Sequence, residues 1–119
     1  MPSIEVTRGT TLTKGAYTQG IARNVAFEAE GVLIGRSRIK GGIKSGWHHH
    51  GTRDLYGFII SGTLRIEYNG GKNWVEVRAG DFFHIPVGLV HRDVNPGRKE
   101  AVVVNISLGQ GPAVVNVEV

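Results

Sequence analysis

Residues 42–62 of the chain read GIKSGWHHHGTRDLYGFIISG, and residues 80–95 read GDFFHIPVGLVHRDVN. His48 and His50 lie two positions apart in the first stretch, and His91 lies in the second. On a β-strand, side chains two positions apart point to the same face, so His48 and His50 are spaced to hold one ion together. Neutral imidazole suits divalent transition metals. His91 is the candidate for a third ligand, supplied by a neighbouring strand.

Taken alone, the triplet 48–50 leaves two interpretations open. It is either an exposed polar turn without a ligand role or part of a metal site. The glycines and prolines around it favour the metal site. Gly42 is followed by five residues and then the first histidine, and Gly80 is followed by five residues and then Pro86-Val87-Gly88. Such residues fix tight turns, which would return His91 toward the same place.

This pattern resembles the two motifs of the cupin superfamily. The stretch 80–95 matches the second motif at every fixed position, and the stretch 42–62 matches the first in its glycine and both histidines. The resemblance implies an all-β fold, a small double-stranded β-helix (cupin, or jelly-roll) barrel. It also implies one cupin domain over residues 1–119, with an N-terminal strand and arm over 1–30, the two motifs over 42–95 and a C-terminal strand over 113–119.

The first motif departs from the family pattern at its acidic position. The family places a glutamate three or four residues after the second histidine and a glycine six residues further on. Here Asp54 follows His50 after three residues, but seven residues separate Asp54 from Gly62. Counting back from Gly62 places Leu55 at the acidic position instead. On a regular strand only one of the two points inward, so either a bulge lets Asp54 reach the ion or the site has three histidines and open positions.

His84 precedes Pro86 on an expected strand. It is the candidate catalytic residue, lining the pocket as a proton shuttle beside the metal ligands. The alternative is a partly buried or surface histidine without a chemical role.

Short alternating stretches support the all-β interpretation. Over residues 63–68, three apolar side chains alternate with charged ones, and Asn69-Gly70-Gly71 then predicts a hairpin turn. Further strands are expected over residues 31–40, 56–60, 82–85, 101–108 and 113–119. The more polar segment 9–30 is interpreted either as an arm across the barrel mouth or as a poorly ordered lead-in.

Composition excludes several classes of function. The chain has no cysteine, so disulfides and thiolate metal sites are excluded. Its net charge is +4, but the basic residues are scattered and form no nucleic-acid motif, so no nucleic-acid partner is expected. No apolar run is long enough to cross a membrane, and no signal peptide is apparent, so a cytoplasmic location is the default expectation. Exposed edge strands and an N-terminal arm predict a homodimer.

Three functional hypotheses follow. The first is a small metalloenzyme, dioxygenase-like or isomerase-like, in which Fe, Mn, Ni, Co or Zn bound by His48, His50, His91 and Asp54 acts on a small carbonyl or phenolic substrate. The second is a non-catalytic module that binds a small molecule such as a sugar or metabolite. The third and weaker hypothesis is a structural protein with a vestigial site.

Overall fold

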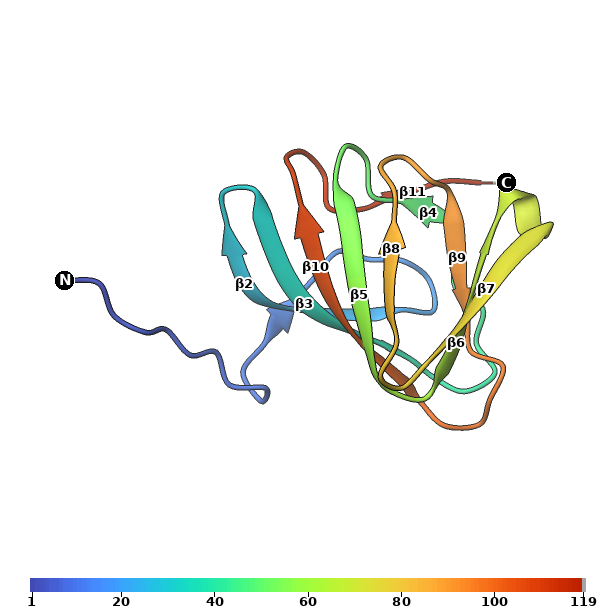
Figure 1. Ribbon diagram of the computed structural model, residues 1–119, viewed down its shortest axis with the longest axis horizontal. Coiled ribbons are helices and arrows are strands. Elements are labelled where there is room, and N and C mark those ends of the chain that lie inside the picture. The colour runs from blue at the N-terminus through green and yellow to red at the C-terminus, as the bar shows by residue number, and fades with distance from the viewer. Residues whose placement is uncertain (119) are drawn as a thin grey trace.

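Two antiparallel β-sheets face each other in this protein, as a computed structural model of residues 1–118 shows (Figure 1). One sheet has six strands in the order β1-β2-β3-β10-β5-β8, and the other has five in the order β11-β4-β9-β6-β7. The elements are β1 (Thr13–Lys14), β2 (Ala22–Ala29), β3 (Val32–Ile39), β4 (His48–His49), β5 (Asp54–Ser61), β6 (Thr63–Tyr68), the 3-10 turn η1 (Asn69–Gly71), β7 (Asn73–Arg78), β8 (Phe82–Ile85), β9 (His91–Val94), β10 (Ala101–Leu108) and β11 (Val115–Asn116). This arrangement is the expected double-stranded β-helix.

The core lies between the two sheets and is formed mainly by one face of β3, β5, β6, β7, β8 and β10. Ile59 and Leu64 are almost completely buried, as are Ile39 and Ala101. On β5 the inward positions are Leu55, Gly57 and Ile59, and the residues between them face outward. This alternation follows from the period of two along a strand. It fixes which side chains of the first motif face the cavity between the sheets.

A glycine turn carries the chain from one sheet to the other. Gly62 lies between β5 and β6 with φ +80°, a conformation that side-chain-bearing residues rarely adopt. A Cβ atom there would also come within 2.8 Å of Ala101 Cα and Glu100 O. This turn therefore packs closely against the start of β10, with no room for a larger residue.

The predicted strands are confirmed with small changes of boundary. The hairpin after residue 68 forms as expected, with Asn69 at φ +53°. The expected C-terminal strand over 113–119 is shorter, Val115–Asn116, and Val119 lies outside the described residues. Within 1–30, β2 forms eight residues of strand, so the segment 9–30 is more regular than a lead-in. The first residues extend away from the sheets (Figure 1).

No helix in the described part of the chain has the length and apolar character needed to cross a membrane.

Asn95 ties the end of β9 to the start of β10. Its side chain is 1% exposed, its Nδ2 donates to the Ile39 and Lys99 carbonyl oxygens, and its Oδ1 accepts from the Gly97 backbone N–H. The side chain of Asn95 thus bonds backbone groups on both sides of this connection.

We expect Asn95→Ala to lower the free energy of unfolding by about 2–4 kcal/mol, because it leaves buried backbone groups without partners. Chemical denaturation would measure the change. Asn73→Ala is the control, since Asn73 is exposed and bonds only the Asn69 side chain, and it should change stability by no more than about 0.5 kcal/mol. Equal effects of the two substitutions would contradict the assignment.

Candidate metal centre

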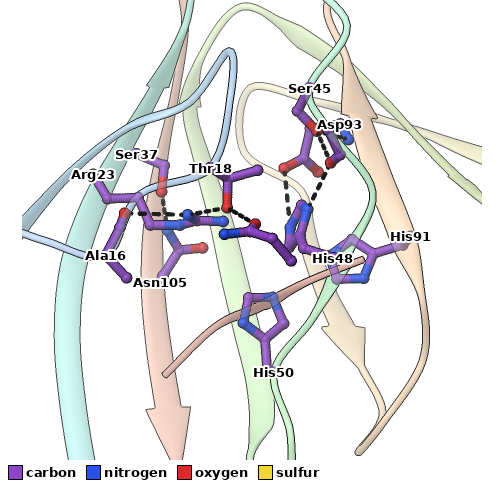
Figure 2. Close-up of polar contacts among 12 residues, drawn as sticks. Ala16, Thr18, Arg23, Ser37, Ser45, His48, His50, His91, Asp93 and Asn105 are labelled. Carbon is purple, nitrogen blue, oxygen red and sulfur yellow. Dashed lines mark hydrogen bonds and ion pairs between the residues drawn. The ribbon is translucent and has the colours of Figure 1, made fainter. Parts of the chain in front are cut away.

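Three histidines converge in the interior, two from β4 and the residue after it and one from β9 (Figure 2). His48 on β4 pairs directly with His91 on β9, and His50 follows β4. All three are at most 5% exposed. The ring centroids are 4.3 Å apart for His48 and His91, 5.1 Å for His50 and His91, and 5.4 Å for His48 and His50. One nitrogen of each ring lies within 4.8 Å of the other two.

Backbone carbonyls fix the orientation of every ring in this cluster. The Nδ1 atoms of His48, His50 and His91 lie 2.9, 3.0 and 2.9 Å from the carbonyl oxygens of Gly46, Ala113 and Leu89, respectively. A carbonyl oxygen only accepts, so each Nδ1 carries the proton and donates it. Each Nε2 then has a free lone pair. Metal-binding histidines are held in the same way, by a hydrogen bond from the nitrogen that does not bind the ion.

Burial keeps the rings of His48 and His50 uncharged. It lowers the pKa of His48 to about 3, and the neighbouring His91 and the positive charge of Arg23 act in the same direction. Burial likewise lowers the pKa of His50 to about 3, assisted by His91, His48 and Arg23. Neutral imidazole is the form that binds a metal.

The Nε2 atom of His50 is buried and has no hydrogen-bond partner among the described residues. A buried polar atom without a partner is costly, and a bound cation would satisfy it. Three imidazoles with Nδ1 bonded to a backbone carbonyl and Nε2 left free are therefore a donor set that fits a divalent transition metal.

The structure places Asp54 away from this cluster. Its Oδ1 lies 2.8 Å from Nε2 of His84, and both side chains are 43% exposed on the outer face of the six-stranded sheet. The reason is the register of β5, which turns Leu55 inward and Asp54 outward without a bulge at this point. This differs from the expected arrangement with Asp54 as a ligand, and it corresponds to the alternative of three histidines with open positions.

His84 also lies outside the cavity, because its neighbours Phe83 and Ile85 on β8 take the inward positions. Its ring stacks on Tyr56 with the centroids 4.6 Å apart. His84 therefore does not lie beside the metal ligands, where the sequence predicted it.

Three charged residues that the sequence interpretation did not single out line the cavity: Arg23, Arg36 and Asp93. Asp93 lies two positions after His91 on β9, and its Oδ2 is 4.0 Å from Nε2 of His48. The signal that would have revealed it is the same two-residue spacing that joins His48 to His50. Arg23 comes from β2 in the opposite sheet, and its position follows from sheet pairing that no local motif encodes.

A cavity of about 70 Å³ adjoins the histidines. At about 10–15 Å³ for each water-sized group, it has room for roughly five to seven such groups. Apart from the charged residues and histidines, its walls are mostly apolar and include Ile39, Leu55, Leu64, Phe83, Ile85 and Val103. A space of this size and lining suits a small organic molecule.

Comparison with known proteins agrees with this architecture. The family model of the cupin domain matches residues 36–107. An uncharacterised conserved protein with a double-stranded β-helix domain from Klebsiella pneumoniae is 20% identical, with a TM-score of 0.74 over 83% of this chain and 85% of that one. A cupin domain from Bordetella pertussis is 27% identical, with a TM-score of 0.66 over 81% of this chain and 100% of that one.

An oxalate oxidase in complex with the substrate analogue glycolate is also similar to this chain. It is 27% identical, with a TM-score of 0.73 over 92% of this chain. This chain spans 61% of the oxidase chain. No curated protein matches the sequence.

We expect His50→Gln to remove most of the metal from protein purified without a tag, because the remaining two rings make an incomplete site. Elemental analysis by mass spectrometry would measure the metal-to-protein ratio. The matched control is His49→Gln, since Nδ1 of His49 accepts the Gly51 backbone N–H and the residue is not part of the cluster. Equal metal content in the wild type and both variants would contradict the site.

Asp54→Ala is expected to leave the metal content unchanged, because the carboxylate faces away from the histidines. The same elemental analysis tests this. A loss of metal as large as that in His50→Gln would show that Asp54 reaches the ion after all.

Proposed function

The chain belongs to the cupin family, and we propose that it is a metal-dependent oxidoreductase or isomerase for a small carbonyl or phenolic compound. The observation that carries this proposal is the set of three buried imidazoles whose Nδ1 protons are all committed to backbone carbonyls. An arrangement of this kind leaves three lone pairs directed at one place beside a cavity. A purely structural cluster would have no need of such free lone pairs.

In this proposal His48, His50 and His91 hold a divalent ion, with Fe, Mn, Ni, Co and Zn all compatible with the donor set. A bound ion of this kind supplies Lewis acidity, and Fe and Mn also supply redox chemistry. Three protein ligands leave coordination positions free for a substrate.

The chain's own residues supply the other requirements of a reaction. Asp93 is the titratable carboxylate nearest to the ligand atom of His48, with Oδ2 4.0 Å away. From there Oδ2 is placed to accept a proton from a substrate hydroxyl or from a carbon next to a carbonyl. Leu55, Leu64 and Val103 wall the cavity, and apolar walls of this kind lower the local dielectric and so strengthen electrostatic interactions inside.

The likeness to oxalate oxidase supports the oxidoreductase part of the proposal, because that protein oxidises a small, oxygen-rich molecule and is similar over most of this chain.

A second candidate function is a module that binds a small molecule without chemistry. The observation in its favour is the outward position of Asp54, which leaves the histidine cluster without a carboxylate ligand. The single domain over 1–119, the homodimer and the cytoplasmic location stay predictions from the sequence.

The two candidate functions differ in whether the protein converts a bound compound into a product. We expect protein loaded with Fe or Mn to consume oxygen, or to isomerise the substrate, with at least one member of a panel of small carbonyl and phenolic compounds.

Asp93→Asn is expected to lower kcat by about 10²–10⁴-fold while retaining the metal, because it removes the proton acceptor. An oxygen electrode and elemental analysis make the two measurements.

His84→Gln is the control and is expected to keep full activity, because His84 lies on the outer face. Saturable binding of panel compounds to metal-loaded protein with no turnover of any of them would favour the binding module.

A further inference from the structure

A positive side chain faces the histidines across the cavity. Arg23 belongs to β2 in the six-stranded sheet, whereas His48 and His91 belong to the five-stranded sheet. Figure 2 shows the Arg23 side chain extending toward Thr18, on the side of the cavity opposite His91.

Among the described residues, hydrogen bonds from the Arg23 guanidinium are made by Nη1 alone. Nη1 donates to Thr18 Oγ1 at 2.6 Å and to the Ala16 carbonyl oxygen at 3.3 Å. Within residues 1–118, no hydrogen bond involves Nε or Nη2 and no carboxylate forms an ion pair with Arg23. The edge of the guanidinium formed by Nε and Nη2 therefore keeps its donors. That edge is the one that binds a carboxylate with two parallel hydrogen bonds.

Asp93 does not supply the missing partner. Its carboxylate acts on Arg23 by charge at a distance, but the two form no ion pair within 4.0 Å, and Asp93 lies beside His48 instead. A half-buried guanidinium without an anion is unfavourable, because burial penalises its charge. With a divalent ion at the histidines, the positive charges in the cavity would outweigh this one carboxylate.

A further free donor lines the same cavity. Ser107 is 3% exposed, and its hydroxyl has no partner among the described residues. It lies on β10, the strand that also carries Asn105, whose Nδ2 donates to Ser37 Oγ at 2.6 Å. The wall that carries Arg23 thus offers unused hydrogen-bond donors, and the opposite wall offers histidine lone pairs.

We propose that Arg23 binds the carboxylate of the substrate, so that the protein acts on small organic acids with a second oxygen function directed toward the histidines. This inference rests on the proposed function and narrows its substrate class from carbonyl and phenolic compounds in general. The two free donors of Arg23 match the two oxygens of a carboxylate, whereas a phosphate presents three. The volume of the cavity fits an acid of roughly five to seven non-hydrogen atoms.

Lactate and its neutral amide, lactamide, test this proposal, because they have the same shape and differ in the charged group. Titration calorimetry on wild type is expected to show at least tenfold tighter binding of lactate. In Arg23→Gln, lactate binding should weaken by about 10–100-fold while lactamide binding stays unchanged. Arg38→Gln is the matched control: it removes a guanidinium that pairs with Glu100 and does not line the cavity, and it should retain the preference for lactate.

The titrations are run on metal-free and on zinc-loaded protein, which separates this inference from the proposed function. If zinc does not bind but Arg23→Gln still abolishes the preference for lactate, the metal proposal fails and the role of Arg23 stands. If zinc binds and the preference survives in Arg23→Gln, the role of Arg23 is overturned and the metal proposal stands. Absence of lactate binding in both forms of the wild type also overturns the role of Arg23.

Thermal unfolding of each variant checks that it is folded. If Arg23→Gln does not fold, Arg23→Lys replaces it, because lysine keeps the charge but has no pair of parallel N–H donors. Lactate binding that weakens several-fold, with lactamide binding unchanged, would support the proposal. Unaltered lactate binding in Arg23→Lys would count against it.

Discussion

The candidate metal site depends on three hydrogen bonds from histidine Nδ1 atoms to backbone carbonyls. They decide which nitrogen of each ring carries the proton, and so they decide that the free lone pairs point to one place. The carbonyls come from separate parts of the chain: Gly46 before β4, Leu89 in the turn before β9, and Ala113 near the C-terminus. Each acceptor lies just before one of three neighbouring strands, β4, β9 and β11, so the five-stranded sheet has to assemble before all three are in place. The positions of the backbone carbonyls in the fold therefore determine which ring nitrogens are free to bind a metal.

The spacing of residues in the sequence predicted the part of the site that depends on local geometry. His48 and His50 share a face because of their two-residue separation, and the Pro86–Gly88 turn brings His91 into register with His48. The fourth ligand was harder to predict, because one residue of register on β5 decides whether Asp54 or Leu55 faces inward. In the structure Leu55 faces inward and packs into the core, and Asp54 faces outward.

Arg23 shows why the remainder of the cavity was not predictable from motifs. It lies in a polar segment without clear periodicity, and it reaches the cavity only because β2 pairs with β3 and the six-stranded sheet faces the histidines. Asp93 is different, since its spacing from His91 follows the same rule that identified the histidine pair. Local periodicity thus accounts for the residues of the five-stranded sheet around the site, and only long-range pairing accounts for those opposite.

The position of Ala113 has a consequence for the order of events during synthesis. His50 is oriented by a carbonyl 63 residues further along the chain, and β11 at Val115–Asn116 then pairs with β4 beside it. A nascent chain that has already produced both motifs still lacks this acceptor. The pocket is therefore incomplete until residues 113–116 have been synthesised and have paired with β4, so the oriented ring of His50 cannot guide the earlier steps of folding.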